Sequence, residues 1–155
     1  MSLATTPNQF TDQLGYLIAS LTSSYTVNIA SANTWTIMGN GLTEISTYNT
    51  DVYRDKMMLS IAGIWKIDVS FTVNGATNDD LQFCLKYGDS AYQHPVIWNA
   101  KGGNNWNINY SMIIKTEIQN ETIYFYMKNE TATNNPVFFN GIFSAIKLTY
   151  NIFGG

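Results

Sequence analysis

The sequence carries little charge for its size. Charged residues make up 12% of its 155 residues, about half of the roughly 25% that is usual in globular domains. Eight Lys and Arg stand against 11 Asp and Glu, which gives a formal net charge of −3. Because proteins that bind nucleic acid need a basic patch to neutralise phosphates, we expect no nucleic-acid partner.

Cysteine and histidine each occur only once. Cys84 cannot form an internal disulfide, and one Cys with one His does not supply a zinc site. Asp89, Ser90 and His94 include the residue types of a hydrolytic triad, but a triad converges from separate elements rather than from one short loop. Asp79 and Asp80 offer oxygen ligands for calcium, but without an Asp-x-Asp-x-Asp pattern and a downstream Glu a solvated hairpin tip is the favoured interpretation. The sequence therefore predicts no enzyme activity and no cofactor.

Long apolar runs are absent as well. No stretch approaches the roughly 20 residues that cross a bilayer. The segment Met1–Pro7 lacks the basic start and the apolar stretch of a secretory signal. We expect no membrane insertion and no export.

The segment Phe10–Ser24 has the spacing of an amphipathic helix. Asn8 is a suitable N-cap, and Asp12 would lie in the first turn, where a negative charge is favourable. The apolar positions are Phe10, Leu14, Leu17, Ile18 and Leu21. We expect residues 1–33 to form a helical attachment segment and residues 34–155 to form the head domain. The helix would either cover the open end of a sheet or act as a stem in an oligomer.

After Tyr25 the apolar period changes from 3.6 to 2. Trp65–Asn74 alternates cleanly between apolar and polar residues, as a half-buried strand does. In the last strand, Phe143–Ile152, the pattern predicts Ile146 and Leu148 to point inward together with Tyr150 and Ile152. Further strands are expected at Thr26–Ile29, Thr34–Met38, Leu42–Ser46, Lys56–Ile61, Leu81–Tyr87, Val96–Asn99, Asn107–Thr116, Thr122–Lys128 and Val137–Phe139. This pattern predicts an all-β fold, an antiparallel jelly-roll sandwich of about 8 to 10 strands with a short N-terminal α-helix.

Aromatic residues reach 14% of the chain, more than the interior of one small β domain needs. Tyr124 and Tyr126 share the strand face opposite Ile123 and Phe125. A strand that is apolar or aromatic on both faces is covered on both faces, which indicates a subunit interface. The candidate interface residues are Tyr110, Tyr124, Tyr126, Phe138 and Phe139.

Four segments together resemble one family of jelly rolls. They are Gly63–Phe71, Leu81–Asp89, Asn107–Met127 and Asn140–Leu148. Over roughly Trp35–Ile152, their order is similar to that of the tumour necrosis factor and complement globular-head superfamily. The resemblance implies a ten-strand jelly roll that forms tight homotrimers.

Within that superfamily, the chain is most similar in character to bacteriophage and viral proteins. The secreted animal members carry signal peptides, collagen stalks or membrane anchors, none of which is evident here. Asn/Thr/Gly-rich jelly rolls with a short N-terminal stem serve viruses as head fibres, capsid decoration and receptor-binding tips. The resemblance therefore implies a trimeric virion protein, assembled in the host cytoplasm, with a capsid protein as partner. The alternative is a soluble bacterial carbohydrate-binding or adhesion module of the same fold.

One loop region could contact a ligand such as a host surface glycan. Aromatic rings stack on sugars, and side-chain amides hydrogen-bond to hydroxyl groups. The candidates are Trp98, Asn104, Asn105 and Trp106. Packing of both Trp in the core or in an interface is the competing interpretation.

Overall fold

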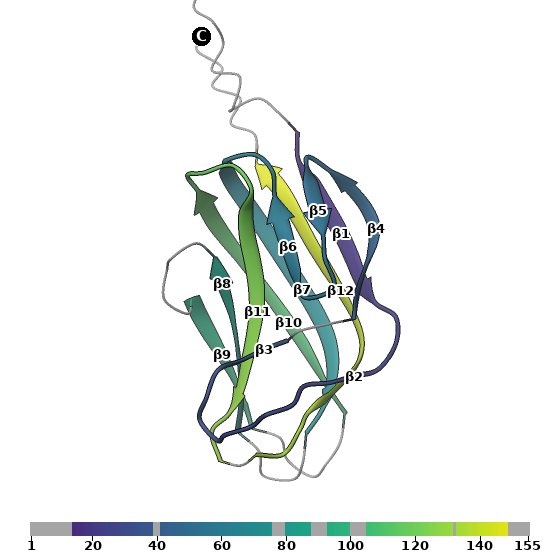
Figure 1. The fold of residues 1–155 in the computed structure, drawn as a ribbon, viewed down its shortest axis with the longest axis vertical. Coiled ribbons are helices and arrows are strands. Elements are labelled where there is room, and N and C mark those ends of the chain that lie inside the picture. Colours follow the sequence, from purple (N-terminus) through teal and green to yellow (C-terminus); the bar gives the residue numbers. More distant parts are fainter. Residues whose placement is uncertain are drawn as a thin grey trace, which may run out of the picture.

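Two antiparallel β-sheets form a sandwich (Figure 1). The computed structural model describes residues 14–38, 41–75, 80–87, 93–99, 105–131 and 133–148. Within these ranges the chain forms twelve strands and no helix, which confirms the all-β prediction. None of the described residues belongs to a helix that could cross a membrane.

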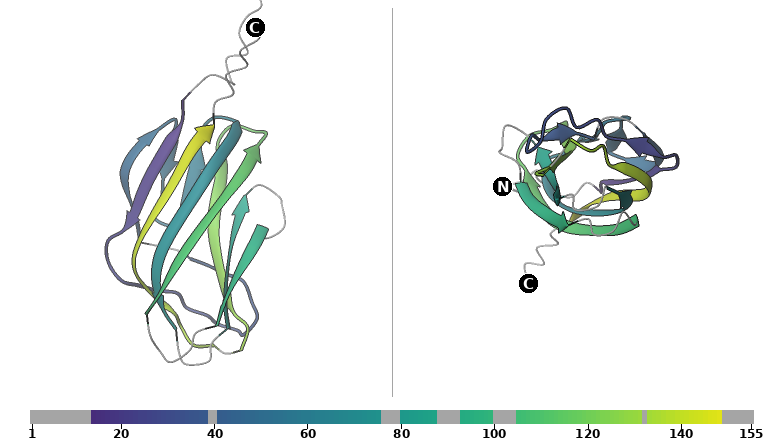
Figure 2. Two further views of the ribbon diagram at one scale, coloured as in Figure 1. Left: turned by 180° about the vertical axis from the view of Figure 1, so that it is seen from behind. Right: turned by 90° about the horizontal axis from the view of Figure 1, so that it is seen from below.

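In the described part of the chain, each sheet contains six strands. The first sheet has, in spatial order, β10 (Asn105–Thr116), β7 (Gly63–Asn74), β12 (Val137–Leu148), β1 (Tyr16–Leu21) and β4 (Leu42–Tyr48), with β2 (Tyr25–Thr26) paired to β12. The second has β5 (Thr50–Val52), β6 (Lys56–Leu59), β11 (Glu121–Asn129), β8 (Asp80–Tyr87) and β9 (Gln93–Asn99), with β3 (Thr36–Ile37) paired to β11. Seen end-on, the two layers enclose the core between them (Figure 2).

The core follows from the period-2 alternation. On β7, the side chains of Trp65, Ile67, Val69 and Phe71 are buried, whereas Lys66 and Ser70 between them are exposed. An aromatic cluster joins the two sheets, because the ring of Phe71 lies 4.5 Å from that of Phe143 and 6.4 Å from that of Phe125, measured between centroids. Edge-to-face packing of this kind adds to the stabilisation from burial alone.

The predicted N-terminal helix is wrong over Tyr16–Leu21, which forms strand β1. This strand lies between β12 and β4 and pairs with both. Leu17, Ala19 and Leu21 point into the core, so the period is 2, whereas the sequence spacing of the leucines also fits a helix. Two flanking strands satisfy the backbone groups on both sides, and this tertiary pairing outweighs local spacing. The division at residue 33 stays a prediction.

Strand β12 joins two segments that the sequence indicates as separate strands. The strand runs without a break through a register shift between Phe138 and Asn140 in its pairing with β7. The predicted inward set is wrong for Ile146 and Leu148, which are 48% and 36% exposed. Phe143, Ala145 and Lys147 occupy the inward positions instead. The aliphatic stem of Lys147 packs over Gly63, where a side chain on residue 63 would collide with it. Because this stem is apolar, the charged residue can occupy an inward position of the strand.

Candidate interaction surfaces

Large apolar side chains are exposed on the outer face of the first sheet. Ile146 of β12 is in register with Tyr16 of β1 and with Lys66 of β7, and Lys66 is in turn in register with Ile113 of β10. Ile113 is 64% exposed. We call the following five residues the apolar face: Ile18, Ile113, Ile142, Ile146 and Leu148. Patches of this kind on soluble proteins mark contact surfaces.

A ladder of uncharged polar side chains continues along the same face of β7 and β10. Its three rungs are Ser70 with Asn109 at 2.9 Å, Thr72 with Asn107 at 3.0 Å, and Asn74 with Asn105 at 3.1 Å. These cross-strand hydrogen bonds stabilise the pairing of the edge strand β10.

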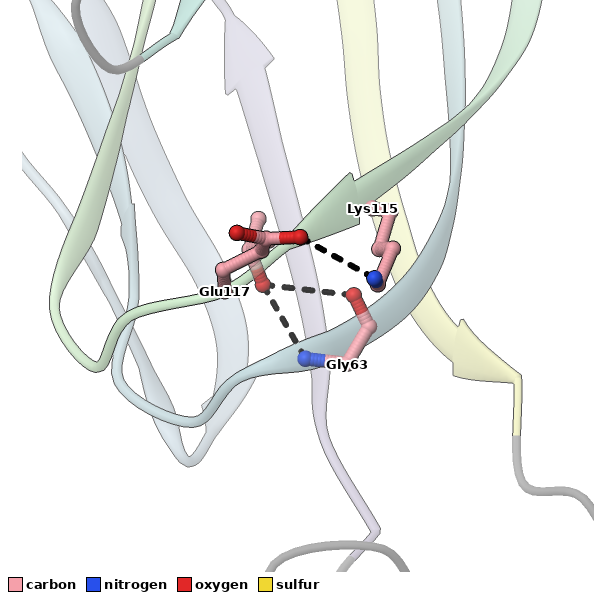
Figure 3. A network of polar contacts seen from close by, with 4 residues as sticks. Gly63, Lys115 and Glu117 are labelled. Atoms are coloured by element: carbon pink, nitrogen blue, oxygen red, sulfur yellow. Dashed lines mark hydrogen bonds and ion pairs between the residues drawn. The ribbon is translucent and has the colours of Figure 1, made fainter.

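Charge on this face is locally neutralised. Next to the ladder, a hydrogen bond from Ser111 and the nearby Lys66 hold the pKa of Asp68 below its ordinary value. Lys66 Nζ lies 3.0 Å from the Asp68 carboxylate. At the end of β10, Lys115 forms a 3.0 Å ion pair with Glu117 (Figure 3).

The two tyrosines predicted at an interface lie on the outer face of the second sheet. Tyr124 and Tyr126 of β11 are half-buried. Tyr124 is in register with Lys56, whose Nζ lies 5.8 Å from the Tyr124 ring centroid and 5.2 Å from that of Tyr53. The place of Tyr124 and Tyr126 in a subunit interface stays a prediction, and it competes with an interface over the apolar face of the first sheet.

The other three predicted interface residues lie closer to the core. The side chain of Phe138 is fully buried between the sheets, where its ring contacts Phe71 and Phe83, so it cannot contact another subunit and is removed from the set. Phe139, on the other face of β12, is half-buried. Tyr110 packs against the core, and its hydroxyl lies 3.3 Å from Met112 Sδ.

The predicted ligand residues do not form one described cluster. Trp98 lies on β9, and Asn104 falls outside the described residues. Asn105 is exposed at the start of β10 as part of the ladder. Trp106 is half-buried against the core, and its indole nitrogen has no hydrogen-bond partner among the described residues. Ligand contact by these residues stays a prediction.

The predicted attachment residues are divided by burial. Leu17 and Leu21 are core residues of β1, whereas Leu14 and Ile18 are 53% and 36% exposed. Phe10 lies outside the described residues. Only Leu14 and Ile18, of those described, can therefore meet a partner without disturbing the sandwich.

The cysteine and the acidic residues considered in the sequence analysis form no catalytic or metal-binding cluster among the described residues. Cys84 is buried on β8, and burial raises the pKa of its thiol to about 12. Among the described residues, no group of three or more His, Cys, Asp or Glu side chains could hold a metal. Asp89, Ser90 and Asp79 lie outside the described residues.

Comparison with known proteins identifies the fold. No protein-family model and no curated protein matches the chain. Among solved structures, the globular domain of zebrafish complement 1qA protein matches with a TM-score of 0.65 at 7% identity, over 90% of this chain and 100% of that one.

Two further structures point the same way. PRD1 vertex protein P5 matches with a TM-score of 0.57 at 17% identity, over 86% of this chain and 96% of that one. The Eiger TNF of S. frugiperda matches with a TM-score of 0.57 at 8% identity, over 91% and 98%. The resemblance expected from the sequence is thus confirmed at the level of fold: this chain has the jelly roll of tumour necrosis factor and complement globular heads, which the PRD1 vertex protein shares.

Proposed function

We propose that the protein is a non-enzymatic, homotrimeric structural protein of a virion, acting as a head fibre, capsid decoration or receptor-binding tip. The observation that carries this proposal is the apolar face of the first sheet. Its five aliphatic side chains lie on strands whose opposite face already forms the core. Strands apolar on both faces are covered on both faces.

A second copy of the chain is the occupant that best fits this face. The two lysines beside the apolar face, Lys66 and Lys115, are each paired with a carboxylate. Copies can therefore approach without repulsion between like charges. The globular heads that the sequence resembles form trimers, which favours a closed threefold assembly over a dimer.

The likeness to a vertex protein supports a place on a virion. We propose that the N-terminal segment attaches the head to a capsid protein, with Leu14, which is not part of the apolar face, as its available apolar contact. Immunogold labelling of native particles should place the protein on the capsid surface; labelling confined to the host cell would contradict the virion role.

Sedimentation equilibrium tests the assembly. At micromolar concentration the wild-type chain should show about three times its monomer mass of 17.4 kDa. Ile146→Asp places a charge in the middle of the apolar face and should give monomers that keep the β-sheet circular dichroism spectrum. Tyr126→Ser, on the second sheet, is the matched control and should remain trimeric. A wild-type monomer would overturn the proposal, and a monomeric Tyr126→Ser would move the interface to the second sheet.

A further inference from the structure

A polar hollow lies beside β4, the edge strand of the first sheet. Its volume is about 360 Å³, within the range of small-ligand pockets. Among the residues that line it are three with hydroxyl side chains, one tyrosine and one arginine: Ser23, Ser24, Thr43, Tyr25 and Arg54. These residues come from three separate parts of the chain: the turn after β1 with the first residue of β2, the start of β4, and the turn between β5 and β6.

Backbone contacts hold these three parts together. The Leu42 N–H donates to the Arg54 carbonyl at 3.2 Å, and Leu42 is in register with Leu21. Gly41 has a φ of +115°, and a Cβ there would lie 2.7 Å from Leu21 Cδ1, so glycine allows the chain to pass close to β1. The hollow is thus formed by the fold itself.

Arg54 lines this hollow without an acidic partner. It is the only arginine in the chain, and no carboxylate of the described residues lies within 4.0 Å of its guanidinium. Its neighbours Asp51 and Asp55 are among the carboxylates that make no such contact. Lys56, the first residue of β6, also has no carboxylate partner among the described residues; its Nζ lies near the rings of Tyr53 and Tyr124. In a chain with so few charged residues, an arginine that lines a hollow and has no acidic partner marks a position that can receive an anionic ligand.

We propose that the hollow binds a saccharide that carries a carboxylate. The planar guanidinium of Arg54 matches a carboxylate with two parallel hydrogen bonds. The three hydroxyl side chains can donate to and accept from sugar hydroxyls, and the Tyr25 ring offers an apolar surface for the C–H face of a sugar. A site built for phosphate would instead converge several backbone N–H groups or cations on one point. This inference specifies the receptor-binding role within the proposed function and rests on it, but it does not require the trimer.

Titration of the full-length protein by two-dimensional amide NMR tests the site. Methyl glucuronoside and N-acetylneuraminic acid are the probes, and methyl glucoside is the neutral control. We expect saturable shifts with the acidic probes, centred on Ser23–Tyr25, Leu42–Thr43 and Arg54. Arg54→Gln should weaken this binding about tenfold or more, since hydrogen bonds to charged groups are among the strongest. Arg54→Lys keeps the positive charge but loses the planar guanidinium, so its affinity for the acidic probes should lie between those of the wild type and Arg54→Gln.

Lys86→Gln is the control for net charge, since it removes one positive charge from β8 of the second sheet, which does not line the hollow, and should leave binding unchanged. The Leu42–Arg54 bond uses the backbone of residue 54, so Arg54→Gln should keep the melting temperature of the wild type. Equal binding of methyl glucoside, equal binding of inorganic phosphate, wild-type affinity in Arg54→Gln, or no saturable binding of either acidic probe would each overturn the proposal. Sedimentation of Arg54→Gln should still show trimers, which separates failure of this site from failure of the assembly.

Discussion

At Gly141 of β12, the space that a side chain would need is occupied by the ring of Phe71. A Cβ would also lie 2.9 Å from the Ser70 carbonyl oxygen, a backbone atom that cannot move aside cheaply. We expect Gly141→Ala to lower the free energy of unfolding by about 1–3 kcal/mol, the usual effect of overpacking. Urea denaturation measures it. Ser144→Ala, three residues along the same strand but on the outer face, should change stability by less than about 0.5 kcal/mol. Equal stability of Gly141→Ala and wild type would show that the ring of Phe71 moves freely.

Burial at Cys84 and Tyr110 makes stability depend on alkaline pH. Desolvation, the largest cause, raises the pKa of the Cys84 thiol from 9.0 to about 12 and that of the Tyr110 phenol from 10.0 to about 12. Both folded-state values lie above the unfolded ones, so the folded state favours the neutral forms. Their contribution is complete below pH 9 and is lost as the pH rises toward 12. The urea midpoint should therefore fall over this window.

The double variant Cys84→Ala/Tyr110→Phe isolates this effect, because it removes both titrating groups while keeping the fold. Its urea midpoint should fall less steeply between pH 9 and pH 11 than that of the wild type. Identical slopes for the two proteins would mean that these groups ionise as easily in the folded chain as in the unfolded one.

At the scale of elements, the observed structures of β1 and β12 differ from those that their sequence patterns predict. The spacing of Leu14, Leu17 and Leu21 fits a helical face, yet Leu17 and Leu21 share the inward face of β1 with Ala19. Because alanine is compatible with both a helix and a buried strand position, the local pattern did not distinguish the two structures. On β12, apolar residues alternate on both faces, and the phase was settled by Phe143, which packs against Phe71, rather than by Ile146.

The strand assignment of β1 makes a prediction that a helical stem would not. Leu17→Ala should lower the free energy of unfolding by about 2–5 kcal/mol, because Leu17 is fully buried in the core. Leu14→Ala, at a 53% exposed position, should change it by less than about 0.5 kcal/mol. Thermal and urea unfolding of both variants give the comparison. Equal, small effects at the two positions would favour a stem that unfolds independently of the head.

For the molecule as a whole, the proposed assembly links stability to protein concentration. Association stabilises the folded state by mass action, so the melting temperature of the wild type should rise with concentration. Ile146→Asp should abolish this dependence, whereas Tyr126→Ser should retain it. Differential scanning calorimetry over a hundredfold range of concentration measures both. A wild-type melting temperature that stays constant over this range would contradict an assembly whose subunits dissociate on unfolding.

The exposed apolar residues of the whole molecule also differ from those that the sequence indicates. The sequence indicates aromatic residues between subunits, but Phe138 lies in the core, and aliphatic residues such as Ile113 and Ile146 are exposed instead. Aromatic content alone does not show which rings the core consumes, because that depends on how the two sheets face each other.

The sequence by itself determined the fold class and most of the strands after Tyr25. Alternation with period 2, as in β7 and β11, is a property of the extended chain, whose successive side chains point to opposite faces. The resemblance to the tumour necrosis factor and complement jelly rolls followed from the order of such strands. Only the tertiary structure decided that Tyr16–Leu21 is a strand, that Lys147 rather than Ile146 points inward, and that Arg54 lines one hollow with Ser23 and Thr43. The physical reason is that a sheet satisfies its backbone through partners far apart in sequence, so register and convergence depend on neighbours that no local pattern contains.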